Sequence, residues 1–280
     1  MPAQKIIIDP QNQNTRYFKD IWSFKGLFYF LAWRDIRVRY KQTAIGVLWA
    51  LLRPLLTIFA LSLVRFIFSP GRQSPIPIPL EIAAGTLPWT FFSSAFSDAA
   101  NSLVANANLV SKVYFPRIIV PASAIIVCLI DFFVSLVIVI AIMLYYQVMP
   151  GIQVLMLPVF LLLAIIAALG CGLYIASLNV KYRDFRYVIP FIVQFGMFIS
   201  PVMFSSNQFY ALDRIPDWVK TLYAFNPMVC VIDGFRWCLF GEQVPLDATK
   251  FIISLSVSVC LLIAGLITFR KMEKEFADVI

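Results

Sequence analysis

Six long apolar runs, separated by short polar pieces, constrain this chain more than any other feature of its sequence. They cover residues 45–68, 83–105, 118–146, 154–178, 187–204 and 251–269. A helix needs roughly 20 mainly apolar residues to cross the hydrocarbon core of a bilayer. Because lipid leaves no partner for exposed backbone polar groups, such runs predict an all-α integral membrane protein with six transmembrane helices. The composition agrees, since 14% of the residues are charged, whereas soluble domains carry about 25%.

Basic residues predict the direction in which the chain crosses the membrane. A cluster of Arg34, Arg37, Arg39 and Lys41 comes just before the first apolar run. If the chain enters the bilayer there from the cytoplasm, sixteen of the 23 Lys and Arg residues lie inside and five lie outside. The positive-inside rule therefore predicts six spans with both termini cytoplasmic. These topology signals account for the net charge of +8, and no soluble domain is long enough for a nucleic-acid module, so we expect no nucleic-acid partner.

The segment before the first run predicts a helix that lies on the membrane. Residues 1–20 are polar and read as a cytoplasmic N-terminus. Residues 21–44 then mix aromatic and basic residues, and their uncharged stretch GLFYFLAW is too short to span. We expect an amphipathic helix in the cytoplasmic interface. The six-span domain then covers residues 45–269, and residues 270–280 form a cytoplasmic tail.

The long piece between the fifth and sixth runs predicts re-entrant helices on the outer side. Residues 205–250 begin too polar for a span, yet WVKTLYAFNPMVCVIDGFRWCLF is too apolar for a free loop. Short helices broken at Asn226-Pro227 and dipping into the outer leaflet reconcile these features, since irregular backbone at that depth must be buried in protein or line a cavity. We assign residues 205–238 to such an outer gate.

Charged residues inside the apolar runs are costly in a membrane and are functional candidates by default. Arg53 and Asp98 fall at similar depths from the cytoplasmic side and could pair, although Arg53 could equally extend to the surface. Asp131 falls near the middle of the third run without an obvious basic partner. We expect Arg65 to extend to the outer surface.

The sequence contains no pattern that predicts an enzyme or a bound cofactor. It has no histidine, no Gly-Lys dipeptide and hence no phosphate-binding GxxxxGK[ST] loop, and no GxGxxG, GxSxG or HExxH. We therefore expect no catalytic residue, cofactor or metal on this chain. Its five cysteines lack CxxC spacing, and Cys230 and Cys238 could pair only in an oxidising compartment.

A short cytoplasmic piece, residues 106–117, carries apolar residues that cannot enter the bilayer past Lys112 and Arg117. Large anchors with a basic rim are typical of a helix that docks on a partner protein. An interfacial turn would give the same pattern, so both interpretations stand. The apolar residues are Leu109, Val110, Val113, Tyr114 and Phe115.

Aromatic residues recur along three of the runs. Rings suit a sliding polymer because sugars present flat apolar C–H faces that bind weakly to them. Packing in the core or against lipid would produce the same pattern. The rings are Trp49, Trp89, Phe92 and Phe96 on the first two runs and Tyr187, Phe191, Phe195 and Phe198 on the fifth.

Several separated motifs occur in one order: RDIRVRYKQTAIGVLWALLRP, GTLPWTFF, NANLVSKVYFPRIIVP, ISPVMF, NPMVCVIDGFRW and FRKMEKEFADVI. From about residue 20 to the end, the chain resembles the membrane subunits of ATP-binding-cassette (ABC) exporters for bacterial surface polysaccharides, such as O-antigen, group 2 capsule and teichoic acid. The resemblance implies a homodimer in the bacterial cytoplasmic membrane with two copies of a separate ATPase, which binds ATP and Mg. It also implies a substrate glycan attached to a polyprenyl pyrophosphate or a similar lipid.

The resemblance also implies roles for residues at the matching positions. A coupling helix to the ATPase maps onto residues 106–117, with Asn108, Leu109, Lys112, Tyr114, Phe115, Pro116 and Arg117. The outer gate includes Pro201, Asn226, Pro227 and Arg236. Arg53, Asp98 and Asp131 join the aromatic residues above as candidates for the translocation pathway.

Alternative functions remain open. An ABC exporter of another lipid or amphipathic substrate is the nearest one. A secondary transporter would need a coupling-ion site, for which Asp131 is the one candidate. A membrane glycosyltransferase or phosphatase would need clustered carboxylates or Arg/His at the interface, which the sequence lacks.

Overall fold

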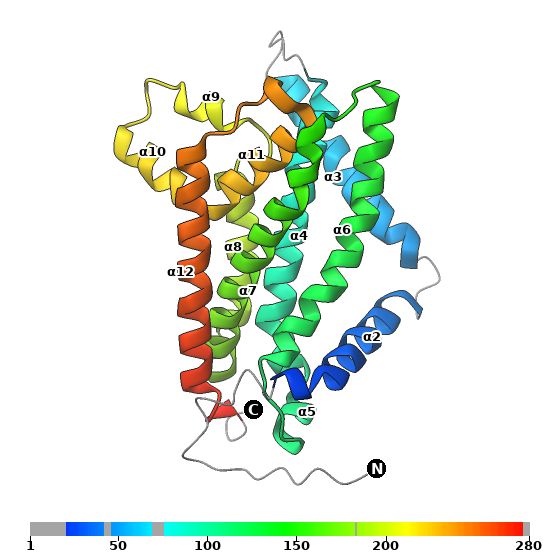
Figure 1. Cartoon of the computed structure of the whole chain (residues 1–280), viewed down its shortest axis with the longest axis vertical. Helices are drawn as coiled ribbons and strands as arrows, with labels where there is room; N and C mark the ends of the chain where they lie inside the picture. Colours follow the sequence, from blue (N-terminus) through cyan, green and yellow to red (C-terminus); the bar gives the residue numbers. More distant parts are fainter. Residues whose placement is uncertain (1–20, 42–45, 69–75, 183, 277–280) are drawn as a thin grey trace.

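The computed structural model describes residues 21–41, 46–68, 76–182 and 184–276, with the side chains of 41, 46–50 and 242 left undescribed. All regular structure in these ranges is helical, which confirms the predicted all-α class (Figure 1). The longer helices are α2 (Lys25–Lys41), α3 (Gly46–Phe68), α4 (Ile78–Ala105), α6 (Ile119–Tyr145), α7 (Leu157–Lys181), α8 (Phe185–Ile199), α11 (Pro227–Phe240) and α12 (Ala248–Met272). The shorter ones are α5 (Ala107–Lys112), α9 (Ser206–Tyr210), α10 (Asp217–Ala224), and the 3-10 turns η1 (Ile152–Met156) and η2 (Gly241–Gln243).

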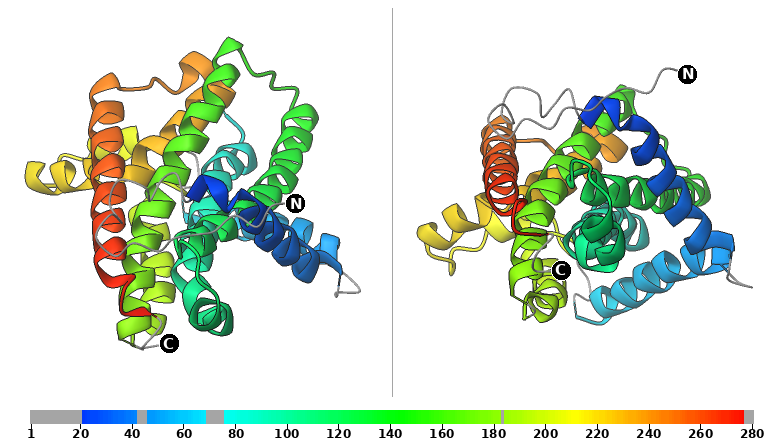
Figure 2. Two further views of the ribbon diagram at one scale, coloured as in Figure 1. Left: turned by 60° about the horizontal axis from the view of Figure 1, so that its bottom comes forward. Right: turned by 90° about the horizontal axis from the view of Figure 1, so that it is seen from below.

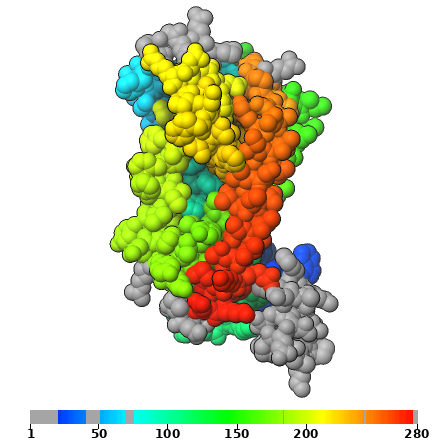
Figure 3. Space-filling view, turned by 90° about the vertical axis from the view of Figure 1, so that its left-hand side faces the viewer, coloured from blue at the N-terminus to red at the C-terminus, as the bar shows by residue number. Residues whose placement is uncertain are grey.

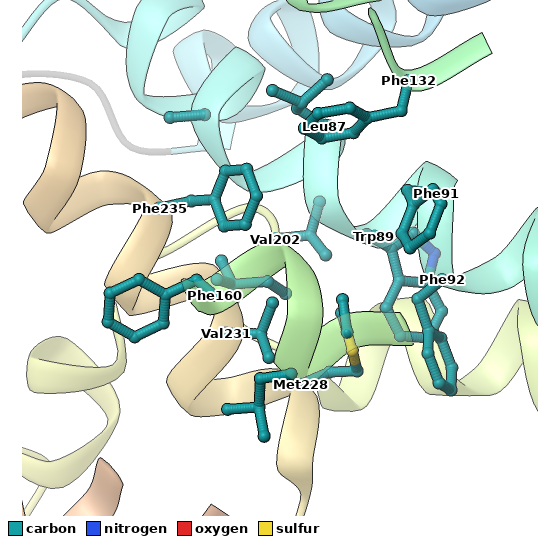
Figure 4. Packing of buried hydrophobic residues seen from close by; sticks show 14 of the residues in the cluster. Leu87, Trp89, Phe91, Phe92, Phe132, Phe160, Val202, Met228, Val231 and Phe235 are labelled. Atoms are coloured by element: carbon teal, nitrogen blue, oxygen red, sulfur yellow. The ribbon is translucent and has the colours of Figure 1, made fainter. Parts of the chain in front are cut away.

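Helix α4 is the central element of the bundle. It packs against α6 and α7 most extensively and also contacts α3, α8 and α11 (Figures 1 and 2). Most of its residues are buried, and its rings join those of α6, α7 and α11 in the main hydrophobic core (Figure 4). Phe132, for example, packs edge-on against both Phe91 and Phe235, with ring centroids 5.6 and 5.9 Å apart. The core therefore joins elements from the first and last thirds of the chain.

Glycines bring α7 close to its two neighbours. A Cβ on Gly265 of α12 would lie 2.3 Å from the carbonyl oxygen of Gly170 on α7, and a Cβ on Gly172 would lie 2.7 Å from the Cβ of Ala99 on α4. Small residues at such contacts allow close helix packing in membrane proteins, where van der Waals contact replaces the hydrophobic driving force. Helices α4, α7 and α12 thus form a tightly packed row.

By length and apolarity, four stretches of the described chain are candidate membrane spans: Leu51–Phe68, Ile119–Tyr145, Ile152–Lys181 and Ala248–Met272. Each of the six predicted runs coincides with one long helix, but α4 and α8 are not among these candidates. Helix α4 is 28 residues long but carries polar residues such as Asp98 along its length. Helix α8 is 15 residues long and ends at Ile199, five residues before the predicted end of its run.

The segment predicted as an outer gate folds into α9, α10 and α11 at the end of the molecule opposite α5 (Figures 1 and 3). The chain breaks between α10 and α11 at Asn226-Pro227, where we predicted it. The side chain of Asn226 accepts a hydrogen bond from the backbone N–H of Met228 (3.0 Å) and Pro227 occupies the first helical position, both of which favour a helix start. Cys230 and Cys238 on α11 are both buried and free.

Candidate functional site

Residues 106–117, hereafter the coupling segment, form a compact projection between α4 and α6. They contain α5, followed by an extended piece that begins at Val113. Val113 and Tyr114 are exposed, with 49% and 63% of their surface accessible, and the side chains of Asn108 and Lys112 are exposed beside them. Large apolar side chains exposed next to a basic one form a surface suited to a partner protein.

Phe115 does not belong to that surface, which corrects our assignment of it as an anchor for a partner. It is 4% exposed and lies in a second hydrophobic cluster with Val110 of α5, Leu31 of α2 and Phe269 of α12. Pro116 is also buried, and Leu109 packs against the same cluster. The apolar residues of the segment are therefore split between an inward face that packs on the chain itself and an outward face at Val113 and Tyr114.

Polar contacts hold both ends of the coupling segment. At its start, Arg34 of α2 donates to the side-chain oxygen of Asn106 (2.7 Å). At its end, the backbone N–H of Arg117 donates to Oε1 of Glu273 (2.7 Å), and the guanidinium of Arg117 donates to the backbone carbonyl of Glu273. The sequence did not reveal these partners, because 72 and 156 residues separate the members of the two pairs.

A second polar cluster joins α2 to the middle of the bundle. Arg39 pairs with Asp98 of α4 (2.8 Å) and Asp131 of α6 (2.6 Å), and the hydroxyl of Tyr40 donates to Asp131. Burial, followed by the hydrogen bond to Asp131 and its charge, raises the pKa of Tyr40, so the phenol keeps its proton. The cluster thus places one cation between two carboxylates.

This arrangement corrects two expectations. Asp98 pairs with Arg39, and Arg53 is exposed, with no carboxylate within 4.0 Å among the described residues. Asp131 does have a basic partner, because α2 inclines across α6 and brings Arg39 to it (Figure 1). Pairing of this kind is the usual way in which charged residues are retained in membrane proteins.

The predicted pathway residues separate into two groups. Tyr187, Phe191, Phe195 and Phe198 are all exposed along α8. Trp89, Phe92 and Phe96 are instead buried in the core, so we correct their assignment to a pathway surface. Trp89 is covered by α8, where a Cβ on Gly196 would lie 2.7 Å from the indole ring. Trp49 belongs to α3, but its side chain lies outside the described residues.

Two arginines hold the irregular stretch that follows α8. Arg236 of α11 is fully buried and donates to the carbonyls of Val202 (2.9 Å) and Phe204 (3.0 Å). Arg65 of α3 donates to the carbonyl of Met203 (2.9 Å) and pairs with Glu81 of α4 (2.7 Å). Three consecutive carbonyls thus have arginine donors, as buried non-helical backbone requires.

Arg65 was misjudged from the sequence. We expected Arg65 to extend to the outer surface, but its side chain is 10% exposed and that of Glu81 is 5% exposed. The sequence offered one indication of this pair: Glu81 stands just before the second apolar run and Arg65 near the end of the first. Pro201, assigned to the gate, is buried in the stretch that these arginines hold, and Asn226 donates to the hydroxyl of Ser200 (3.0 Å).

Aromatic contacts join the short helices at this end. Phe209 of α9 stacks on Tyr223 of α10 with ring centroids 4.2 Å apart, and the ammonium of Lys250 lies 4.0 Å from the centroid of Tyr210. Burial raises the pKa of Tyr210 to about 12, so it remains neutral near pH 7. The contacts join α9 to α10 and to the start of α12.

These features define a class of protein: an α-helical membrane bundle with a compact projecting segment at one end and short helices closing the other. The chain belongs to the ABC-2 type transporter membrane family, whose model matches residues 26–240. It is 28% identical to the O-antigen export system permease protein RfbA of Myxococcus xanthus, over 94% of this chain and 98% of the relative. It is also 28% identical to RfbA of Klebsiella pneumoniae (88% and 92% covered), and 26% identical to the polysialic acid transport protein KpsM of Escherichia coli (86% and 91% covered).

Proposed function

We propose that this chain is the membrane subunit of an ABC exporter that carries a lipid-linked surface polysaccharide outward across the bacterial cytoplasmic membrane. The observation that carries the proposal is the coverage by relatives: permeases for O-antigen and polysialic acid match nearly the full length of the chain. The family membership confirms the predicted ABC transporter class. The glycan carried by this chain, and its lipid carrier, are parts of the proposal.

Energy enters through a separate ATPase in this proposal. The chain has no phosphate-binding loop of its own, so ATP and Mg reside on the partner. The exposed face of the coupling segment, with Val113 and Tyr114 as anchors and Lys112 at the rim, supports the contact. In the proposed homodimer, each chain engages one ATPase copy through its coupling segment, so that two chains bind two ATPase copies.

The membrane arrangement that we propose has six spans with both termini in the cytoplasm. Helix α4, at 28 residues and about 42 Å, is long enough to cross despite its polar residues. Helix α8, at 15 residues and about 22 Å, crosses together with the buried stretch that follows it. The first part of α2 lies at the cytoplasmic interface, with the exposed Tyr29 and Phe30, and Trp22 just before the helix, toward the headgroups. The helix then inclines into the bundle, where Arg39 meets Asp131. Helices α9, α10 and α11 form the outer gate.

The exposed rings of α8 support the translocation pathway. Their row offers repeated weak contacts to sugar faces, and the apolar side chains exposed on α3 offer a surface for the second copy. We assign the pathway to the space between two copies, because the rings of α8 are exposed on the outside of the described chain. Arg53 is exposed on α3 and would face that space or the cytoplasmic headgroups.

The proposed function is tested by reconstituting the chain with its ATPase in proteoliposomes. ATP hydrolysis should rise when the lipid-linked glycan is added and should not rise with the same lipid lacking the glycan. Equal stimulation by the bare lipid would favour a lipid exporter instead. Tyr114→Ala should weaken association with the ATPase by about thirtyfold, the effect of losing an exposed aromatic anchor, whereas Tyr145→Ala, at an exposed tyrosine near the opposite end, should leave it unchanged.

A further inference from the structure

We propose that the end of α12 and the turn after it, residues 270–276, are a working part of the coupling site. Glu273 and Phe276 hold Arg117, and Arg117 in turn positions Tyr114 for the ATPase. This inference rests on the proposed function, because it takes the coupling segment as the part of the chain that the ATPase engages.

Glu273 binds the backbone just before the start of α6. Helix α6 begins after Ile118, whose side chain cannot accept a hydrogen bond, and no side-chain cap is present at that position. The carboxylate of Glu273 accepts the N–H of Arg117, next to the amino-terminal end of α6. The first N–H groups of a helix lack partners within it and favour a negative charge there. The N–H groups of Ile119 and Val120 already donate to the carbonyls of Pro116 and Arg117, so the tail holds the residue that leads into α6 and adds a negative charge beside the helix start.

Phe276 makes a second contact with Arg117, through its ring. Its ring is 1% exposed and packs edge-on against Phe269 of α12, with centroids 5.3 Å apart. The guanidinium of Arg117 lies 6.0 Å from the centroid of that ring, within the range of a cation–π contact. Phe115 and Phe276 belong to one hydrophobic cluster. The turn thus contributes both a polar and an apolar contact to the end of the coupling segment.

Tyr114 depends on these contacts because it lies outside any helix. The chain becomes extended at Val113 and remains irregular until α6 begins. On one side of Tyr114 the chain is anchored by Val110 of α5, and on the other by Phe115 and Arg117. If Arg117 loses its partner, Phe115 alone holds the chain on that side of Tyr114. Figure 1 shows the end of α12 and α5 at the same end of the bundle.

The contact itself can be tested on the permease without its ATPase. Glu273→Ala should make the amide of Arg117 exchange with deuterium about tenfold faster, as the loss of one hydrogen bond to a charged group predicts. Glu273→Gln should stay within about twofold of the unmodified protein, because its amide oxygen still accepts. Glu275→Ala is the matched control, because that exposed acid lies 3.6 Å from Lys181 and not on Arg117. Unchanged exchange in Glu273→Ala would overturn the proposal.

The positioning role is tested by a double-mutant cycle in the complex with the ATPase. Glu273→Ala should weaken association about tenfold in the otherwise unmodified chain and have almost no effect once Tyr114 is alanine, because the tail acts through that ring. Glu273→Gln should bind normally. An equal loss in both backgrounds would mean that the tail acts by general destabilisation, which contradicts the proposal. If Tyr114→Ala alone binds normally, the proposed coupling site fails, and the exchange result identifies that failure separately.

Discussion

Arg39, near the end of the first described helix, forms a 2.6 Å ion pair with Asp131 in the middle of α6. The same guanidinium pairs with Asp98 at 2.8 Å, so a single residue ties α2 to two helices of the bundle. Arg34 of α2 also binds the start of the coupling segment. Helix α2 is therefore connected both to the segment where we place the ATPase and to the middle of the bundle.

Arg39→Ala should destabilise the protein by about 2 kcal/mol. The variant leaves two carboxylates together without their cation, and the value lies between those for exposed and buried pairs because each side chain is about one-third exposed. Thermal unfolding in nanodiscs measures the change. Adding Asp98→Asn and Asp131→Asn should recover part of the loss, and Arg37→Ala, at an exposed position on the same helix, should have little effect. Failure of the triple variant to recover would contradict the role of charge.

Arg236→Lys should cost about 3 kcal/mol or more. The guanidinium reaches three carbonyls, those of Glu81, Val202 and Phe204, with a planar set of donors that an ammonium on a flexible stem cannot reproduce, and the site is fully buried. Arg214→Lys, on the exposed turn between α9 and α10, should change stability by less than about 0.5 kcal/mol. Chemical or thermal unfolding of the two variants compares them directly. Equal stability would show that charge alone is required at Arg236.

Phe115→Ala and Tyr114→Ala should separate folding from partner binding. The first removes a buried ring and should cost about 3–5 kcal/mol of stability. The second removes an exposed ring and should leave the melting temperature almost unchanged while it weakens association with the ATPase. Melting curves and co-purification, measured on equal amounts of inserted protein, distinguish the two. A large loss of stability in Tyr114→Ala would show that the ring packs on the chain.

Replacing the rings of α8 should slow export without unfolding the protein. Phe191 and Phe195 are exposed and lie with centroids 4.2 Å apart, so together they present the aromatic surface that we assign to the glycan. Phe191→Leu with Phe195→Leu keeps the side chains apolar but removes the flat faces, and should reduce the export rate several-fold. Phe133→Leu, at an exposed ring on α6, is the control. Normal export by the double variant would favour a lipid-facing role for α8.

Single cysteines test the orientation of the chain. In a background from which the five native cysteines have been replaced, Ser111→Cys and Asn207→Cys place exposed thiols at opposite ends of the bundle. An impermeant thiol reagent on intact cells should label the site at 207 and not the one at 111. The reverse pattern would invert the proposed topology.

The sequence predicted the helices well because their signal is local. Each apolar run became one long helix, and the break at Asn226-Pro227 falls where the cap and the proline indicate it. The end of α8 was placed too late because apolar composition continues through Val202 and Phe204, where tertiary hydrogen bonds from Arg236 take over from the helix. An apolar sequence indicates that a segment is buried, but it does not indicate whether the backbone hydrogen bonds there are helical or tertiary.

The site was predicted less completely because its contacts are between distant residues. The exposed position of Tyr114 agrees with the predicted docking segment, but Phe115 beside it faces inward, and a six-residue helix followed by extended chain gives no period from which to tell them apart. Arg39 reaches Asp131 because α2 is inclined across the bundle. Counting residues along a single helix gives the depth of a residue but not the inclination of another helix. Nothing in the sequence singles out Glu273, because the tail carries two further acids, Glu275 and Asp278, beside three basic residues.

The arginine contacts after α8 also limit how far the outer end can open. Because Arg236 joins α11 to Val202 and Phe204, those residues and α11 behave as one fixed block. Between Phe204 and the cap at Asn226, the chain forms a tethered flap made of α9 and α10, and both of its hinges belong to that block. In the proposed dimer, any opening of the outer end that keeps these hydrogen bonds must therefore come from movement of the flap or of the two copies, and not from separation of α11 from the stretch after α8. We expect that lengthening or shortening the chain between Phe204 and Asn226 would change the width of the opening while leaving the rest of the bundle as it is.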